Sequence, residues 1–145
     1  MVDYQCLHIL HYFREDLLGA GGVVSFTGYV RDFHEDKSVT GLVLEAYPEL
    51  TEKAIEEEIA TIKAQWSLLK LEAVHRTGLV KKDDPIVWVA AASPHRRAAF
   101  EAADCLMDYL KTKALLWKKE IRETTEEWIK PREEDYNRAK RWEKE

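Results

Sequence analysis

Strand-like segments in this chain occur in neighbouring pairs, and this arrangement limits the folds that the chain can adopt. The pairs are residues 23–30 with 42–47, residues 69–76 with 86–92, and residues 115–121 with 127–129. Runs of β-branched and aromatic residues between turn signals are typical of strands. Short connections join antiparallel strands, whereas parallel strands need a long crossover, usually a helix. The order therefore predicts an α+β fold with an antiparallel or mixed sheet, and it disfavours a doubly wound parallel sheet.

Helix-like segments separate these strand pairs. They are residues 4–18, 50–66 and 94–114, followed by a last helix that we expect to begin at Pro131. In residues 50–66, apolar side chains recur at steps of three or four, which is typical of an amphipathic helix. We expect Thr51 to cap this helix and Ser93 to cap the next one, with Pro94 as its first residue. The chain has no repeat and no linker-like stretch, so we expect residues 1–145 to form a single domain.

The charge balance argues against one large class of function. The chain has 22 basic and 27 acidic residues, a net charge of −5, whereas a general nucleic-acid-binding protein needs a basic face. The balance is uneven along the chain. Residues 111–145 contain 11 basic and 9 acidic residues, and residues 1–110 contain 11 and 18. The basic residues of this acidic chain can therefore converge on a local anion site.

Other functional classes lack their sequence signals. Two cysteines without a CxxC spacing predict neither a disulfide framework nor a metal site. The glycine-rich motifs that bind nucleotide phosphates are absent from the sequence. The longest apolar runs, such as residues 86–92, are too short to span a bilayer, and the sequence shows no signal-peptide pattern. We therefore expect a cytoplasmic protein with no bound metal, no cofactor and no membrane contact.

One group of candidate residues lies at the start of the predicted helix 94–114. His95 and Arg96 would occupy its first turn. Free N–H groups at a helix start, together with an arginine and a histidine, are suited to binding an anion. The alternative is an exposed basic turn that pairs with nearby acidic side chains.

A second group of candidates consists of Lys111 and Lys118. Lys111 ends the predicted helix, where a cation is favourable for structural reasons alone. Lys118 follows Trp117 in a predicted strand, so with Trp117 inward the lysine would face a pocket wall. A lysine that transfers protons needs a lowered pKa, which burial or neighbouring cations such as Arg31 and Arg96 provide. The alternative is that both lysines are ordinary solvated surface residues.

Several strings in this sequence resemble the large, catalytic subunit of molybdopterin synthase. They are GYVR (28–31), LEAYP (44–48), HRTG (75–78), SPHRRAAFEA (93–102), MDYLKTK (107–113) and WKKE (117–120). Each string is short, but their order and spacing together are specific. The resemblance extends over about residues 19–142, nearly the whole chain.

The resemblance implies an α/β-hammerhead fold with an additional antiparallel β-sheet. It also implies a sulfurtransferase that converts cyclic pyranopterin monophosphate into molybdopterin by inserting two dithiolene sulfurs. The sulfur arrives on a small ubiquitin-like subunit whose C-terminal Gly-Gly tail is a thiocarboxylate. In the implied assembly, two large subunits form a central homodimer, and one small subunit at each end completes a heterotetramer.

The resemblance also implies roles for individual residues. It assigns catalysis to Lys111 and Lys118, and substrate binding to four further residues, which are Arg31, His95, Arg96 and Arg132. These residue types suit the chemistry, because the substrate phosphate and the thiocarboxylate are both anionic. Ring opening and sulfur addition also need proton transfers, for which a lysine with a perturbed pKa is a candidate.

The sequence departs from the family pattern in a few places. Leu115 stands where the family usually has proline, and the loop at residues 124–126 lacks the usual glycine. The alternative function is a catalytically silent scaffold that keeps the fold and still binds the small subunit. The retained candidate lysines, Lys111 and Lys118, argue against that alternative.

Overall fold

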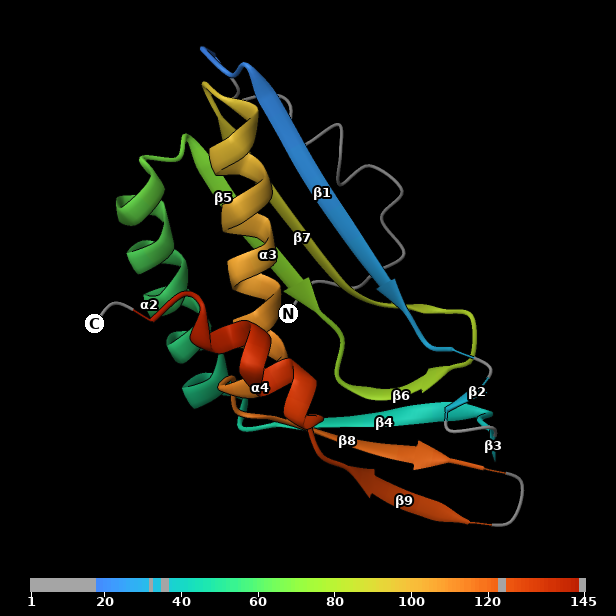
Figure 1. Cartoon of the computed structure of the whole chain (residues 1–145). Coiled ribbons are helices and arrows are strands. Elements are labelled where there is room, and N and C mark those ends of the chain that lie inside the picture. Colours follow the sequence, from blue (N-terminus) through green and yellow to red (C-terminus); the bar gives the residue numbers. More distant parts are fainter. Residues whose placement is uncertain (1–17, 32, 35–36, 123–124, 144–145) are drawn as a thin grey trace.

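The computed structural model describes residues 18–31, 33–34, 37–122 and 125–143 (Figure 1). The predicted helix 4–18 lies outside these residues, apart from Leu18. The helices are α2 (Pro48–Trp66), α3 (Arg96–Thr112) and α4 (Glu133–Lys140). The strands are β1 (Gly22–Tyr29), β2 (Phe33–His34), β3 (Lys37–Ser38), β4 (Gly41–Ala46), β5 (Lys70–His75), β6 (Gly78–Lys81), β7 (Pro85–Ser93), β8 (Leu116–Ile121) and β9 (Glu126–Ile129).

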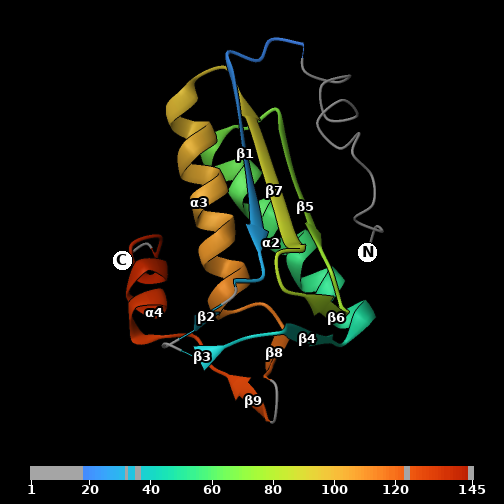
Figure 2. The ribbon, with the colours of Figure 1, turned by 90° about the vertical axis from the view of Figure 1, so that its right-hand side faces the viewer.

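A three-stranded antiparallel sheet, in the order β1-β7-β5, forms one half of the core. Helices α2 and α3 cover one face of this sheet, as the two views in Figures 1 and 2 show. Alternate residues of β7 point to that face, among them Val89 and Ala91, both fully buried. On α3, Ala99 and Leu106 are fully buried against them. The small side chains let helix and sheet approach closely, which fixes the position of α3 along its length.

A second antiparallel sheet, in the order β6-β4-β8-β9, runs across one end of the first (Figure 1). All pairings in the two sheets are antiparallel, and two of the predicted strand pairs are present, β5 with β7 and β8 with β9. The predicted pairing of residues 23–30 with 42–47 is wrong, because β1 pairs with β7 and β4 belongs to the other sheet. Strand β6 is an addition to the predicted elements. It begins at Gly78, which has a φ of 82°, and ends before a turn in which Asp83 has a φ of 67°. The first of these left-handed conformations suits glycine, and Asp tolerates the second.

The start of α2 differs from the predicted one. Tyr47 is the N-cap residue, so Thr51 lies one turn inside the helix. The prediction that Thr51 caps this helix is therefore wrong. The Thr51 hydroxyl accepts a hydrogen bond from the Tyr47 N–H (3.1 Å) and donates one to the Leu115 carbonyl (2.7 Å). Thr51 is buried. This contact ties the start of α2 to the segment that leads into β8.

The starts of α3 and α4 also lie later than predicted. Ser93 still belongs to β7, where it pairs with Gly22, so the N-cap of α3 is His95 rather than Ser93. The Ser93 hydroxyl accepts the N–H of His95 at 3.2 Å. Pro131 precedes α4, whose N-cap is Arg132. The pairing of Ser93 with Gly22 sets the start of α3, and the local hydrogen bond between the Arg132 N–H and Asp135 sets the start of α4.

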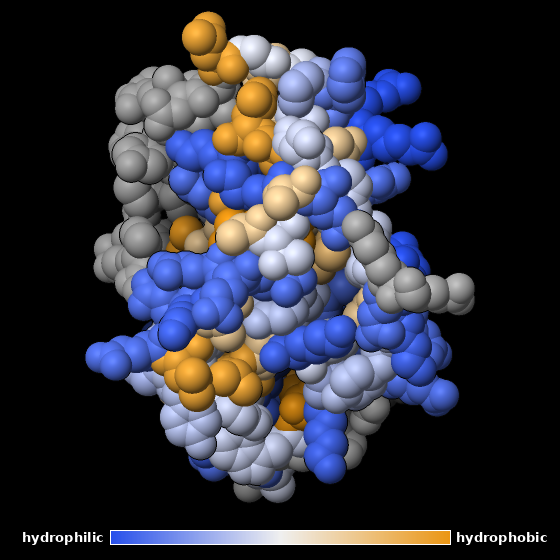
Figure 3. Space-filling view, turned by 90° about the vertical axis from the view of Figure 1, so that its left-hand side faces the viewer, coloured by the Kyte–Doolittle hydropathy of each residue, from blue (hydrophilic) through white to orange (hydrophobic). Residues whose placement is uncertain are grey.

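The face of the molecule that carries α2 is mostly hydrophilic, with apolar residues in separate spots (Figure 3). This agrees with the solvent-facing side of α2, on which acidic side chains such as Glu52, Glu56 and Glu57 are exposed. The concentrated basic residues lie elsewhere, at the junction of the two sheets.

Candidate active site

A cavity of about 540 Å³ opens where the two sheets meet. The ends of β1, β7, α3, β8 and β9 surround it, together with the start of α4. Its charged lining residues are Arg31, Lys111, Lys118, Glu120, Lys130, Arg132 and Asp135. Five of these seven groups are cationic, so the cavity has the electrostatic character of an anion site.

Lys111 lies in the last turn of α3 and is held by Asp135 of α4. The Lys111 Nζ atom lies 3.1 Å from the Asp135 Oδ1 atom, and the Asp135 side chain is only 6% exposed. Its other oxygen accepts the Arg132 backbone N–H at 3.0 Å. Burial acts to raise the pKa of Asp135, but these hydrogen bonds and the Lys111 charge hold that pKa below its ordinary value. Asp135 is therefore an ionised partner for Lys111 at neutral pH.

Lys118 lies in the same cavity without such a partner. Among the described residues, no hydrogen bond or ion pair reaches its ammonium group. Burial lowers the pKa of Lys118, and the nearby charges of Lys111 and Arg31 lower it further, while Asp135 opposes the shift. A lysine in this environment releases its proton more readily than a solvated lysine, as acid–base chemistry at neutral pH requires.

The strand alternation that pointed to Lys118 is present, with one correction. Trp117 is not inward: its side chain is 42% exposed, and its ring meets Tyr47 edge-on with centroids 5.2 Å apart. Lys118 occupies the opposite face of β8 and faces the cavity, as predicted. Two inward positions of β8, Lys118 and Glu120, are thus polar because they line a cavity rather than the core.

Arg31 reaches the cavity because β1 is irregular at its end. The register of β1 against β7 shifts between Gly28 and Tyr29. A Cβ atom at Gly28 would stand 2.7 Å from the Val87 Cγ1 atom. Glycine is therefore needed for a close approach, as its place in the strand indicates. The bulge turns the chain so that Arg31 lines the cavity.

His95 and Arg96 do not line this cavity. Both are exposed at the opposite end of α3. Arg96 precedes Lys111 by 15 residues, which is about 22 Å along a helix that rises about 1.5 Å per residue. The expectation that Arg96 stands beside the lysines is therefore wrong within one chain. Of the six predicted site residues, Arg31, Lys111, Lys118 and Arg132 come together, and these two do not.

Comparison with known proteins gives a family. Residues 4–113 match the family described as MoaE protein. The chain belongs to the MoaE family. A relative from Pseudomonas aeruginosa, named molybdopterin synthase catalytic subunit, is 48% identical over 126 residues, which cover 87% of this chain and 84% of the relative.

Solved structures show the same fold. The molybdopterin biosynthesis MoaE protein from Burkholderia ambifaria MC40-6 has a TM-score of 0.77 and 36% identity, covering 94% of this chain and 89% of that one. A chain in the protein–protein complex of subunits 1 and 2 of molybdopterin-converting factor from Helicobacter pylori 26695 has a TM-score of 0.71. It is 22% identical and covers 86% of this chain and 84% of that one, so it supports the fold alone. The predicted α+β fold with antiparallel sheets is confirmed.

Two acidic residues of the cavity were not predicted to have a role. Glu120 is 2% exposed and accepts a hydrogen bond from the Arg122 guanidinium at 2.6 Å. Strand alternation places it on the same face as Lys118, which could have indicated it. Asp135 is the second. Its position in the first turn of the last helix, where an acidic side chain is favoured, could have indicated it.

His75, in the HRTG string, has a structural environment. Its Nδ1 atom lies 2.8 Å from the Arg76 carbonyl oxygen, and the residue is buried. Burial lowers the pKa of His75 to about 4; the hydrogen bond to Arg76 opposes this shift, and the Lys118 charge adds to it. His75 is therefore neutral at pH 7, so it adds no charge to the surroundings of Lys118.

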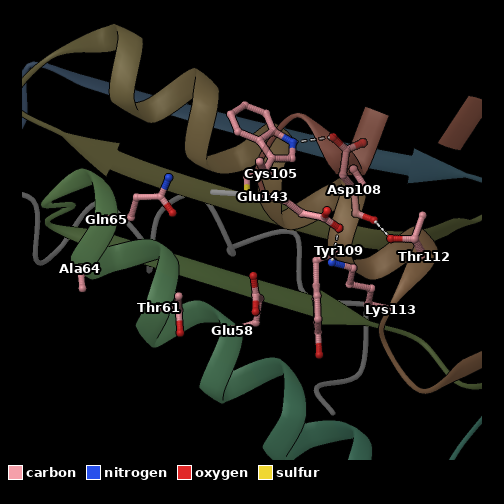
Figure 4. Close-up of a pocket in the computed structure, with 12 residues that line it drawn as sticks. Glu58, Thr61, Ala64, Gln65, Cys105, Asp108, Tyr109, Thr112, Lys113 and Glu143 are labelled. Carbon is pink, nitrogen blue, oxygen red and sulfur yellow. Dashed lines mark hydrogen bonds and ion pairs between the residues drawn. The ribbon is translucent and has the colours of Figure 1, made fainter. Parts of the chain in front are cut away.

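A second cavity, of about 520 Å³, lies between α2, α3 and the C-terminal segment (Figure 4). It contains none of the predicted site residues. Its buried carboxylate, Asp108, accepts hydrogen bonds from the Trp142 Nε1 atom (2.7 Å) and the Arg141 guanidinium (3.0 Å). Lys113 pairs with Glu143 at 3.2 Å. These contacts attach the C-terminal segment to α3, which is a structural role.

Two further observations limit the chemistry of the described residues. No group of three or more His, Cys, Asp or Glu side chains in the described ranges is placed to hold a metal ion. No helix among them is long and apolar enough to cross a membrane.

Proposed function

We propose that this chain is the catalytic subunit of a molybdopterin synthase. It converts cyclic pyranopterin monophosphate into molybdopterin, receiving two sulfurs from the thiocarboxylate of a small ubiquitin-like subunit. Family membership and the relatives named molybdopterin synthase catalytic subunit support this activity. The observation that carries it is the cavity in which Lys118 lies among Arg31, Lys111 and Arg132, with no ion-pair partner in the part of the chain that the structure describes.

The cavity suits the two reactants because both are anionic. The substrate carries a phosphate, and the tail of the small subunit ends in a thiocarboxylate. Bringing two anions together in water is opposed by their repulsion, and fixed cations that already face the cavity remove this penalty. We assign phosphate and tail binding to Arg31 and Arg132, and catalysis to Lys111 and Lys118. The side chains supply charge and protons, and the partner supplies sulfur.

The partner in this proposal is a small ubiquitin-like sulfur carrier with a C-terminal Gly-Gly tail. A solved relative of the same fold comes from a complex of subunits 1 and 2 of molybdopterin-converting factor. A tail that ends in two glycines is thin enough to enter a narrow cavity, and its terminal charge is attracted by the cations inside. We place this activity in the cytoplasm, in keeping with the free, buried thiol of Cys105.

We also propose that two copies form the centre of a heterotetramer, and this assembly gives His95 and Arg96 a place. Strand β1 is an edge strand of its sheet in the described residues, and α3 packs beside it. Phe26 on β1 is 47% exposed, and Phe100 on α3 is 61% exposed. A two-fold axis beside β1 and α3, perpendicular to α3, would make the two α3 helices antiparallel. The start of α3 in one copy would then lie near the cavity of the other.

Reconstitution tests the proposed activity directly. The purified chain is mixed with cyclic pyranopterin monophosphate and a thiocarboxylated small subunit, and the dithiolene product is measured. The matched control replaces the thiocarboxylate by the ordinary carboxylate on the same subunit. Product with the first carrier and none with the second supports the proposal. A chain that binds the carrier but yields no product is the silent scaffold instead.

A further inference from the structure

The two lysines of the cavity differ in what surrounds their ammonium groups. Lys111 is ion-paired with Asp135 at 3.1 Å, and its side chain is 40% exposed. Lys118 is more enclosed and has no ion-pair or hydrogen-bond partner among the described residues. The two ammonium groups therefore lie in different electrostatic surroundings.

We propose that Asp135 is a positioning residue that gives the two lysines different tasks, holding Lys111 as a fixed ammonium group and leaving Lys118 to exchange protons. The inference rests on the proposed function, because the tasks concern the reaction in this cavity. In this arrangement Lys111 contributes a permanent positive charge for an anionic reactant. Lys118 serves as the acid and base.

The position of Asp135 is set by the backbone of α4. Its Oδ2 atom accepts the N–H of Arg132, the N-cap residue, at 3.0 Å, which orients the carboxylate. Its Oδ1 atom is then directed to Lys111, 24 residues earlier in the chain. A buried carboxylate that satisfies both a helix N-terminus and a lysine joins α4 to α3 in one geometry. The side chain of Arg132 lines the same cavity, so Asp135 also holds the backbone from which that side chain extends.

The charges around Lys118 come from every element packed against it. The cations are Arg31 after β1, Lys111 in the last turn of α3, and Lys130 and Arg132 after β9. The anions are Glu120 and Asp135, and His75 at the end of β5 is the further titratable group. Glu120 is bound to Arg122 at 2.6 Å, and His75 is neutral. Asp135 is thus the anion that moderates the field of the cations at Lys118. Its charge acts on both lysines, but its hydrogen bond acts on Lys111 alone.

Asp135→Asn tests this division, with Glu133→Gln as the matched control. Asparagine keeps an oxygen that can accept the Arg132 N–H, so α4 is retained while the charge is lost. Glu133 is an exposed acid in the same first turn of α4 and has no ion pair among the described residues. Asp135→Glu restores the charge, and glutamate is also favoured at the third position of a helix.

The first measurement is chemical and needs no activity. Competitive acetylation of the free protein at fixed pH, followed by peptide mass spectrometry, gives the reactivity of each lysine. In the unchanged protein we expect Lys118 to be acetylated faster than Lys111, which is held in an ion pair. In Asp135→Asn we expect acetylation of Lys111 to become faster, because the ion pair at 3.1 Å is lost. Equal reactivity of the two lysines in the unchanged protein, or an unchanged reactivity of Lys111 in Asp135→Asn, overturns the inference.

The second measurement is the pH dependence of product formation in the reconstituted synthase. We expect the rising limb in Asp135→Asn to move to lower pH, because Asp135 then no longer opposes the effect of the cations on Lys118. We expect Asp135→Glu to restore it and Glu133→Gln to leave it in place. A fall in rate with an unmoved limb would make Asp135 merely structural. If the lysines react with the acetylating reagent as expected and neither the variants nor the unchanged protein form product, the proposed function fails and the lysine assignment stands.

Discussion

We expect replacement of Gly28 by alanine to disturb both the packing of β1 and the geometry of the cavity. The new Cβ atom would stand 2.7 Å from the Val87 Cγ1 atom. Optimal carbon contacts lie near 3.5–4.0 Å, so strand and side chain must separate by roughly 1 Å. Overpacking of this kind destabilises a core by about 1–3 kcal/mol. At this chain length we expect the melting temperature to fall by about 2–12 °C.

The same displacement acts on function, because Arg31 follows Gly28 by three residues and Val87 lines the same cavity. We therefore expect slower product formation by Gly28→Ala even at temperatures where it stays folded. Gly22→Ala is the matched control in the same strand, since its Cβ would lie at an ordinary 3.5 Å from Arg96 Cα.

A double-mutant cycle with Val87→Ala makes the reasoning refutable. Val87→Ala removes the Cγ1 atom that a methyl group at position 28 would meet, so the two changes together should be less destabilising than their sum, by roughly 1–2 kcal/mol. Urea unfolding of the four proteins measures this coupling. Additive effects, or a Gly28→Ala variant as stable as the unchanged protein, would show that the close approach is not the reason for glycine.

Three further predictions concern stability. Lys118→Met should be more stable than the unchanged protein near pH 7, because the folded state lowers the pKa of Lys118 and so disfavours its charged form. This advantage should shrink as pH rises toward 10.5, the ordinary lysine pKa. Urea unfolding at pH 7 and pH 10 measures the difference. Asp108→Ala leaves the Trp142 indole N–H without its acceptor and leaves Asp104 as the remaining carboxylate partner of Arg141, so it should lower stability by about 1–3 kcal/mol, with product formation per folded molecule unchanged. Leu106→Ala, at a fully buried position of α3, should lower the free energy of unfolding by about 2–5 kcal/mol, measured in the same way.

Sequence patterns predict the elements of this fold better than their boundaries. The helix α2 follows from its periodic apolar face and the strand β7 from its unbroken apolar run, because both must meet a core. Strand β6 was missed because its four residues include one fully buried side chain, Val80, and its pairing with β4 bridges distant segments. The start of α3 was misplaced because Ser93 continues a ladder with Gly22, which local rules for capping do not include.

The candidate site was predictable where strand alternation decides it and not where distant segments meet. Lys118 follows from alternation along β8. The ion pair between Lys111 and Asp135 depends on how α4 packs against α3, which no local pattern contains. The separation of Arg96 from Lys111 was implicit in the length of their helix, since a rise of about 1.5 Å per residue places them about 22 Å apart.

The claim that sulfur transfer takes place at the junction of the two sheets is tested most directly with two lysine variants of α3. Lys111→Ala removes a charge from this cavity, and Lys113→Ala removes one from the second cavity, two residues away. Dithiolene formation is measured for both with the thiocarboxylated small subunit and precursor. We predict a loss of about 10²-fold or more for Lys111→Ala and a near-normal rate for Lys113→Ala. Near-normal turnover by Lys111→Ala, or an equal loss in both variants, would contradict the assignment.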